Sequence, residues 1–318
     1  MVSNLKKTRS SRQVLIENLN IRQKRIEYLN TIKQFREQKR NIVYTDETYI
    51  LSSHTVSKTW TDGSIGQTTP ISKGDRLIII HAGSENGFIP NSLTMWRSSV
   101  STGDYHNQMN WENYKKWLEE KLIPNLLSNS VLVMDNASYH CKIDEKAPTS
   151  NSRKADMISW LQKNNISYTE SMLKPTLYKL IKYHKPYHTK YLVDNLMKEH
   201  GHDVLRLPPY HPDLNPIENI WNILKQWVAS HNTTFKIHDI ERLAQEKFNM
   251  MGATDWAPVC NHIIKNENEY LEKEICFDSE QDKYIFEFGS GSTDEDLSDT
   301  DSVDSTSETD LTGIEPLQ

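Results

Sequence analysis

The spacing of apolar and polar positions is helical at the start of the chain and strand-like soon afterwards. Between residues 12 and 40, apolar side chains recur every three or four positions among basic residues, which predicts an amphipathic helix. Such a helix can lie on DNA through its basic face or dock on the following domain through its apolar stripe, and the pattern leaves both open. The stripe consists of Leu15, Leu19, Ile26, Leu29, Ile32 and Phe35.

Runs rich in β-branched residues predict strands from residue 41 onward. NIVYTDETYI (41–50) is the first run, and HTVSKTW (54–60) is expected to be its hairpin partner. RLIIIHAG (76–83) and VLVMD (131–135) are nearly continuous apolar runs, as in strands that are buried on both faces. Two shorter strands are expected, near 88–96 and at 204–207.

Helical periodicity dominates the rest of the chain. Asn110 is expected to cap a helix that ends near Pro124, and Asn215 is expected to cap another with Pro216 in its first position. Strands first, followed by alternating strands and helices, predict an α/β fold with a mixed sheet flanked by helices. Further helices are expected around 153–163, 172–183 and 189–200, and onward to about 275.

Charge is distributed unevenly along the 318 residues, whose 37 Lys and Arg stand against 43 Asp and Glu. Residues 1–40 hold 11 basic and three acidic side chains, whereas 289–318 hold nine acidic and no basic ones. That tail is mostly Ser, Thr, Asp and Glu, so we expect it to be disordered, as a solubilising or a phosphorylated segment. The predicted regions are a basic helical arm (1–40), a folded domain (41–276) and an acidic tail (277–318).

Composition excludes several classes of protein. No apolar run is long enough to span a membrane, and the first residues lack the apolar stretch of a secretory signal. Cys141, Cys260 and Cys276 are odd in number and widely spaced, which excludes a disulfide framework and a CxxC metal site. We therefore expect a reduced, intracellular protein with no membrane partner.

Three acidic residues stand at positions that favour metal chemistry. Asp46 lies within the first strand run, Asp135 ends an otherwise apolar strand, and Glu218 is in the first turn of a helix after a proline-rich loop. Carboxylates at the ends of buried strands in an α/β sheet point into the crevice where such folds bind ligands. Three of them could hold two Mg²⁺ ions, which would stabilise the attacking and leaving oxygens of a phosphoryl transfer.

The local pattern leaves other interpretations open. Asp46 could be an ordinary turn residue, and Glu218 could complete a capping box with Asn215 three residues earlier. VLVMD (131–135) also resembles the Mg²⁺-binding strand of a P-loop ATPase, but the chain has no GxxxxGK(S/T) motif, which excludes that alternative. The pattern alone indicates metal-dependent phosphoryl chemistry and no more.

Taken together, three segments resemble the motifs of the Tc1/mariner-type, IS630-related DDE transposases. They are YTDET (44–48), VLVMDNASYH (131–140) and LPPYHPDLNPIENIW (207–221). The third is the most specific, because PDLNPIEN is a long and chemically unusual string. The resemblance covers about residues 41–275, and it implies an RNase H-like catalytic domain with a mixed five-stranded sheet between helices.

The resemblance also implies the site and its chemistry. Asp46, Asp135 and Glu218 match the catalytic acids, which in that family hold two Mg²⁺ or Mn²⁺ ions. There the metals activate water to nick the element ends, and the freed 3′-hydroxyl attacks target DNA, typically at TA. Four further residues match motif positions beside these acids and are expected to support them: Asn136, His140, Asn215 and Pro216. For His140, a purely structural role is an alternative.

The spacing of the acids departs from the family pattern. Between the first and second acids lie 88 residues, which is ordinary, but 82 lie between the second and third, about 48 more than in typical members. Residues 154–168 and 189–207 each have the pattern of a helix, a polar turn and a short strand, and one such unit is enough to reach the third acid. Residues 169–188, with part of one unit, are therefore expected to form an inserted helical element.

The side chains of this insertion have two functional interpretations, with an ordinary solvated hairpin as the alternative to both. Four histidines suggest zinc, although neither a cysteine pair nor a clear tetrahedral spacing accompanies them. Three lysines interleaved with three tyrosines suit phosphate contact and base stacking. The residues are His184, His188, His200 and His202, then Lys182, Lys185 and Lys190 with Tyr183, Tyr187 and Tyr191.

The start of the chain is a second departure. About 40 residues precede the first strand, too few for the paired helix-turn-helix modules that recognise element ends in this family, so we expect such recognition to be missing. The leading hypothesis is a Mg²⁺-dependent DNA endonuclease and transposase domain in the nucleus, with transposon ends and target DNA as partners and a homodimer as a candidate assembly. The alternatives are a non-catalytic DNA- or protein-binding module derived from a transposase, and a host RNase H or repair nuclease.

Overall fold

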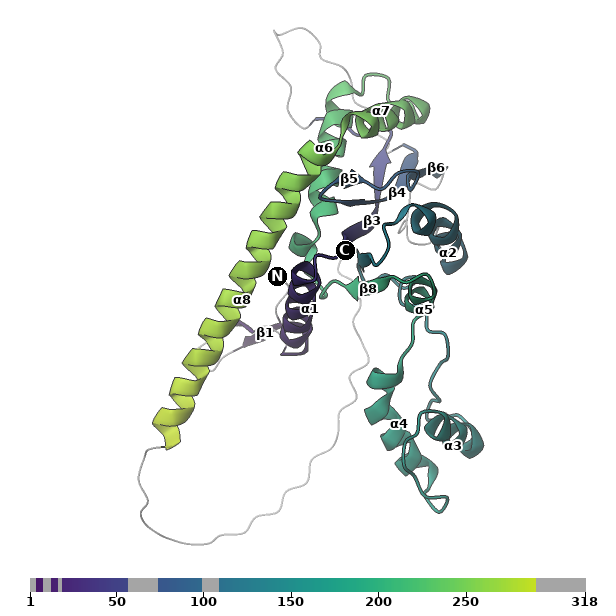
Figure 1. The fold of residues 1–318 in the computed structure, drawn as a ribbon, viewed down its shortest axis with the longest axis vertical. Coiled ribbons are helices and arrows are strands. Elements are labelled where there is room, and N and C mark those ends of the chain that lie inside the picture. The colour runs from purple at the N-terminus through teal and green to yellow at the C-terminus, as the bar shows by residue number, and fades with distance from the viewer. Residues whose placement is uncertain (1–3, 8–12, 17–18, 57–73, 99–108, 290–318) are drawn as a thin grey trace. The chain divides into compact units, whose positions relative to one another are not determined.

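The computed structural model of the protein describes residues 4–7, 13–16, 19–56, 74–98 and 109–289 (Figure 1). The chain divides into two compact units, residues 1–274 and residues 275–318. The described part of the second unit is the helical continuation of α8 (Ala253–Gly289). The first unit contains the central sheet and a separate antiparallel pair, β1 (Asn4–Lys7) and β2 (Gln13–Ile16). Within the described ranges, no helix combines the length and the apolar character needed to cross a membrane.

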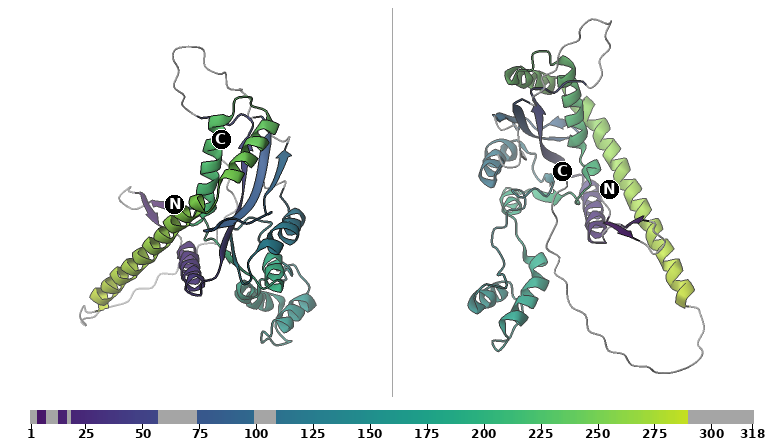
Figure 2. Two further views of the ribbon diagram at one scale, coloured as in Figure 1. Left: turned by 45° about the horizontal axis from the view of Figure 1, so that its top comes forward. Right: turned by 180° about the vertical axis from the view of Figure 1, so that it is seen from behind.

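A mixed sheet of six strands forms the centre of the first unit (Figures 1 and 2). Its order is β5-β4-β3-β7-β8, and β6 pairs with β4 along the same edge as β5. β3 is antiparallel to β4 and parallel to β7, which is parallel to β8. The α/β prediction is confirmed, but the expected five strands become six, because two short strands share the outer edge of β4. The strands are β3 (Ile42–Leu51), β4 (Arg76–Ser84), β5 (Gly87–Phe88), β6 (Thr94–Ser98), β7 (Val131–Met134) and β8 (Asp203–Arg206).

The hairpin partner predicted for the first strand is wrong. β3 pairs with β4 over the register that runs from Tyr44 opposite Gly83 to Leu51 opposite Arg76. Residues 54–56 belong to no strand, and 57–60 lie outside the described residues. β4 is the better partner because it is buried over almost its whole length and so contributes apolar area on both faces, whereas most side chains of HTVSKTW are polar.

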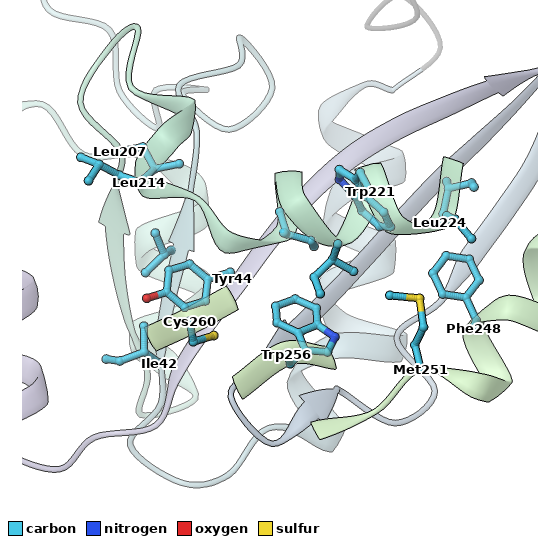
Figure 3. Packing of buried hydrophobic residues seen from close by; sticks show 14 of the residues in the cluster. Ile42, Tyr44, Leu207, Leu214, Trp221, Leu224, Phe248, Met251, Trp256 and Cys260 are labelled. Carbon is cyan, nitrogen blue, oxygen red and sulfur yellow. The ribbon is translucent and has the colours of Figure 1, made fainter. Parts of the chain in front are cut away.

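The two-residue period of β3 separates two apolar clusters on the faces of the sheet. Ile42 and Tyr44 join the cluster covered by α1, α6, α7 and α8, which Figure 3 shows from close by, whereas Val43 joins the cluster covered by α2 and α5. In the first cluster the ring of Trp256 lies directly against Gly83, where a Cβ atom would overlap it. The helices are α1 (Leu19–Glu37), α2 (Trp111–Trp117), α5 (Leu192–Glu199), α6 (Pro216–His231) and α7 (Ile237–Met250).

The helix predicted near the start of the chain docks on the sheet. α1 begins at Leu19, after β2, so the predicted span of 12–40 is longer than the helix itself. Tyr28, Leu29 and Ile32 are buried in the first cluster, while Leu19 is 74% exposed. Of the two interpretations of the apolar stripe, the structure therefore favours docking on the following domain.

The helix predicted after residue 110 is confirmed together with its cap. The Asn113 N–H donates to Asn110 Oδ1 over 2.8 Å at the start of α2. The chain then continues through a π-helical turn, Leu118–Leu122, and a 3-10 turn, Ile123–Asn125. Pro124 lies in this last turn, so the helical segment ends where the sequence predicted.

Residues 144–190 leave the sheet and return to it as a helical hairpin. An antiparallel bridge between Ile143 and Tyr191 closes the base of the hairpin. Its helices, α3 (Lys154–Lys163) and α4 (Lys174–His188), bury an apolar cluster of their own, separate from the two described clusters of the sheet. The hairpin contains the predicted 169–188 and, as the part of one unit that belongs with it, α3, which packs with α4; β8, after α5, pairs with β7 in the sheet. The cluster consists of Met157, Trp160, Leu161, Ile166, Leu177 and Ile181.

Candidate active site

The parallel pairing of β3 and β7 brings the first two predicted acids level with each other. The register joins Tyr44 to Val133, and continuing it by two residues places Asp135 beside Asp46. Tyr44 and Val133 both belong to the cluster under α6. Because side chains alternate along a strand, the two acids lie on that same face. Both therefore stand where β7 ends, on the side of the sheet that α6 covers.

Glu218 reaches the same place from the first turn of α6. The chain arrives there through a 3-10 turn, Pro212–Leu214, and the buried Pro216 opens the helix. Asp46, Asp135 and Glu218 together line one cavity of about 490 Å³. The structure thus brings all three predicted acids together, from the middle of β3, the end of β7 and the start of α6.

Burial and neighbouring carboxylates raise the pKa values of two of the acids in this cavity. Burial is the largest cause of a pKa for Asp46 well above the ordinary range, and the carboxylates of Glu47, Glu218 and Asp135 raise it further. Burial also raises the pKa of Glu218, with Lys225 opposing the shift and Asp135 adding to it. Negative charge crowded in this way is relieved when a cation binds among the carboxylates.

Neighbouring groups hold the two strand-borne acids in place. The Trp221 Nε1–H donates to Asp46 Oδ2 over 3.1 Å from α6. The Ala137 N–H donates to Asp135 Oδ1 over 2.9 Å, and Nδ1 of His140 lies 2.6 Å from the same oxygen. Each carboxylate therefore has one oxygen fixed by the protein.

Glu47 is a site residue that the sequence reasoning missed. It follows Asp46 in β3, so its side chain lies on the opposite face of the sheet, where it is buried. The Tyr139 hydroxyl donates to Glu47 Oε2 over 2.9 Å. Nε2 of His140 lies 3.5 Å from Oε1, close enough for an ion pair but not aligned for a hydrogen bond. The one signal in the sequence was a second acid inside a strand that is otherwise suited to burial.

His140 stands between two carboxylates and is completely buried. Burial alone would lower the pKa of His140, but Glu47 and Asp135, on either side of the ring, raise it to about 9. The ring is therefore protonated at neutral pH and attracts both carboxylates. This arrangement fits the supporting role predicted for His140 better than that of an isolated structural histidine.

The two predicted asparagines differ in what they contact. Asn136 Nδ2 donates to the Leu207 carbonyl over 2.7 Å and so ties the end of β7 to the end of β8. Asn215 is 2% exposed, and its Oδ1 has no hydrogen-bond partner among the described residues. The Glu218 N–H donates to the Asn215 carbonyl over 3.3 Å, and the Asn215 side chain does not cap the helix. The capping box considered for this pair is therefore not formed.

The zinc interpretation of the insertion histidines is wrong. Within the described ranges, no group of three or more His, Cys, Asp or Glu side chains is placed to hold one ion. His202 instead accepts a hydrogen bond from the Ser130 N–H over 3.2 Å, and the ring of His188 packs edge-on against Trp160. Local packing and hydrogen bonding account for these two histidines.

The three acids suit hard divalent cations in chemistry and in position, although no three described side chains surround a single point. Mg²⁺ is commonly bound through one or two carboxylates, while waters and substrate phosphates complete its shell. Asp46, Asp135 and Glu218 supply such oxygens on the wall of one cavity. Asn215 lines the same cavity, and its buried Oδ1 has no hydrogen-bond partner among the described residues.

Comparison with known proteins points in the same direction. Residues 94–241 match the family model described as DDE superfamily endonuclease. Among solved structures, the mariner Mos1 paired-end complex with Mg is similar, with a TM-score of 0.50 and 12% identity over 86% of this chain and 66% of that chain. The Mos1 transposase paired-end complex with the left transposon end gives 0.49 and 14% over 84% and 66%. The catalytic domain of Mos1 mariner transposase gives 0.42 and 11% over 81% and 95%.

These likenesses differ in what they establish. The chain spans about two thirds, 66%, of the length of the transposase in the paired-end complex with Mg, and at 12% identity that likeness shows the fold. The family match contains Asp135 and Glu218, and Asp46 precedes it. The match of 94–241 to the DDE superfamily endonuclease model and the mixed-sheet fold shared with the Mos1 complex agree with the resemblance of the three motifs to Tc1/mariner-type transposases.

Proposed function

We propose that the protein cleaves DNA strands and transfers them by metal-dependent phosphoryl transfer. The observation that carries this proposal is the convergence of Asp46, Asp135 and Glu218 on one cavity, where burial and neighbouring carboxylates raise the pKa values of Asp46 and Glu218. Three crowded carboxylates form a poor site for an anionic substrate on their own. With divalent cations between them and the substrate, they form a good one.

The cofactor that fits is Mg²⁺ or Mn²⁺, as two ions. Solved paired-end complexes of mariner Mos1 include one with Mn and one with Mg. When bound, such ions activate the attacking oxygen and stabilise the leaving oxygen of an in-line displacement. Asp46, Asp135 and Glu218 would hold them, with Asn215 Oδ1 as a further oxygen at the same cavity.

The remaining side chains of the site position these ligands. Trp221 fixes one oxygen of Asp46 by its 3.1 Å hydrogen bond. His140 contacts one oxygen of Asp135, and the buried Glu47 on the other side of the ring keeps the imidazole charged. Fixed donors lower the reorganisation needed when substrate arrives, which is how such neighbouring contacts contribute to rate.

The partners we propose are transposon-end DNA and target DNA, the latter typically at TA. The Mos1 relatives are described as paired-end, pre-cleavage and strand-transfer complexes, and a paired complex also favours a homodimer. A DNA-cutting enzyme of this kind acts in the nucleus, and the basic residues of 1–40 support that location. A fluorescent fusion of the whole chain that stays in the cytoplasm would contradict the nuclear assignment.

The test is nicking of supercoiled plasmid by the purified chain with Mg²⁺, with Mn²⁺ and with a chelator. We expect metal-dependent nicking that is lost in Asp135→Asn, because the amide supplies neither the charge nor the second oxygen donor. Asp75→Asn is the matched control, since Asp75 is an exposed aspartate outside the cavity.

Each other outcome has a defined meaning. Metal-dependent nicking that is equal in Asp135→Asn and the parent chain would refute the assignment of the acids. Salt-sensitive DNA binding without turnover under either metal would favour the non-catalytic binding module. Preferential cleavage of RNA–DNA hybrids would favour a host nuclease that shares only the fold.

A further inference from the structure

The helical hairpin 144–190 differs in charge from the domain on which it is inserted. The hairpin contains nine Lys and Arg against four Asp and Glu. The rest of 41–288 contains 17 basic and 27 acidic residues, so the hairpin is a basic element on an acidic domain. DNA binding depends largely on the neutralisation of phosphates by Lys and Arg. To bind DNA, the domain needs a positively charged surface. Outside the hairpin, acidic residues outnumber basic ones in 41–288.

Within the hairpin, positive charge gathers on the outer face of α4. Leu177 and Ile181 turn inward and are buried in the hairpin's own cluster. Lys179, Lys182 and Lys185 recur at three-residue spacing and are all exposed, so they follow the solvent side of the helix. The spacing alone would also suit an ordinary solvated helix. The residues around the three lysines distinguish such a helix from a phosphate-binding face.

The charge of this face is not cancelled by neighbours. None of the three lysines forms an ion pair with a described residue, and α4 itself contains no acid. Three of the four acidic side chains of the hairpin contact other groups: Glu145 pairs with Lys163, Asp156 accepts the Arg153 N–H, and Asp144 accepts from Asn195. A helix that needed only solubility would gain more from mixed charges.

Two exposed tyrosines lie beside the lysines. Tyr183 is 69% exposed and Tyr187 is 77% exposed, and their ring centroids are 6.5 Å apart on successive turns. The hydroxyl groups of exposed tyrosines can donate to phosphate and sugar oxygens of DNA. The face therefore combines cations and hydroxyl donors, the two kinds of group that contact a nucleic-acid backbone.

The base of the hairpin is connected to the acid cavity through fixed contacts. The base of the hairpin is the bridge between Ile143, three residues after His140, and Tyr191. The Arg206 guanidinium lies over the Tyr191 ring, 4.2 Å from its centroid, and donates to the His140 carbonyl over 3.0 Å. These contacts join the base of the hairpin to His140, whose ring contacts Asp135 in the wall of the cavity.

We propose that the outer face of α4, with Lys179, Lys182 and Lys185, binds the phosphate backbone of duplex DNA that flanks the cleaved phosphate. The proposal rests on the proposed function, because it takes its partner from there. It assigns the insertion a role: the hairpin extends the DNA-contact surface of a catalytic domain whose own charge is unfavourable for DNA. The contact is to the backbone, so it is independent of base sequence.

The test measures how DNA affinity depends on salt. Binding of the full chain to a labelled duplex of about 40 base pairs is followed by fluorescence anisotropy, with chelator present and salt varied between about 50 and 200 mM. For the Lys179→Gln/Lys182→Gln/Lys185→Gln variant, we expect the slope of log affinity against log salt to become shallower by about 3, with affinity reduced roughly tenfold or more.

A control variant separates local contact from total charge. Lys116, Lys236 and Lys265 are exposed lysines on other elements, and Lys116→Gln/Lys236→Gln/Lys265→Gln removes the same charge. An unchanged slope in the α4 variant would overturn the proposal, and so would an equal change in the control variant. Circular dichroism and a thermal melt verify that both variants fold like the parent chain.

The same preparations distinguish this proposal from the proposed function. If the parent chain nicks DNA with Mg²⁺ but the α4 variant keeps the full salt slope, the α4 surface is wrong and the catalytic assignment stands. If the α4 variant loses slope while the parent chain never nicks under either metal, the surface stands and the catalytic assignment is wrong.

Discussion

Replacing Arg36 with methionine tests whether α1 is an integral part of the folded unit that contains the acid cavity. Arg36 near the end of α1 makes two hydrogen bonds to Glu267 on α8, from Nε over 3.2 Å and from Nη2 over 2.9 Å. It also donates to the Tyr44 hydroxyl in β3 over 2.9 Å. The Glu267 side chain is 6% exposed and Arg36 is 24% exposed. Methionine keeps much of the apolar stem and removes the charge.

The expected loss of stability follows from the burial of Glu267. Breaking a buried ion pair by removing one partner typically costs about 3–5 kcal/mol, because the other charge stays buried without compensation. Solvent reaches part of Arg36, so we expect about 2–3 kcal/mol for Arg36→Met. Arg242→Met is the control: Arg242 pairs with Glu246 on the surface of α7, and such pairs contribute about 0.5 kcal/mol or less.

The loss should also depend on pH in a defined direction. Burial raises the pKa of Glu267 in the folded chain, and the charge and hydrogen bonds of Arg36 oppose that rise. Without Arg36 the folded pKa rises further above the unfolded value. The penalty is therefore absent below the unfolded pKa, where the carboxyl is neutral in both states, and it grows as the pH rises to the folded pKa. Arg36→Met should be least destabilised in mild acid.

The assay is urea unfolding followed by tryptophan fluorescence, at neutral pH and in mild acid. Arg36→Met/Glu267→Gln should be more stable at neutral pH than Arg36→Met, because the double variant buries no charge. A loss for Arg36→Met no larger than that of Arg242→Met, or a loss that increases toward acid, would refute the buried-pair argument and with it the docking of α1 through this contact.

Three other predictions concern the fold and the site. Trp256→Ala should cost about 3–5 kcal/mol in urea unfolding, because it empties the space against Gly83 in the main core, and a loss below 1 kcal/mol would contradict that packing. Leu177→Ala should destabilise only the hairpin, by about 2–4 kcal/mol, so hydrogen exchange should speed up across 154–188 and stay unchanged in β3. His140→Gln should weaken Mn²⁺ binding about 10–100-fold in a calorimetric titration, since it releases Asp135, and unchanged affinity would exclude a positioning role.

Elements with strong local signals were predictable from the sequence. The apolar run that ends in Asp135 is β7, and Asn110 caps α2, because both signals depend only on neighbours along the chain. The grouping of Asp46, Asp135 and Glu218 was also predicted, chiefly from the three motifs and not from local pattern. The structure adds that the three acids line one shared cavity.

The errors arise where distant segments compete. The partner of β3 is β4 and not the nearest run, because a strand buried on both faces contributes more apolar area than a short polar one. The sequence also left open which of two similar units belongs to the insertion. Residues 154–168 and 189–207 have the same local pattern, and only packing shows that the first joins α4 while the second joins the sheet.

By itself, the sequence determined which residues are the candidates for chemistry: the three acids, the motif around Glu218 and the basic, tyrosine-bearing insertion. These depend on residue type and spacing, which folding does not alter. Only the tertiary structure decided what surrounds them, including the Trp221 contact to Asp46 and the buried Glu47 behind His140. The physical reason is that burial and charge pairing depend on which faces meet across the sheet, and the register of strands distant in sequence sets those faces.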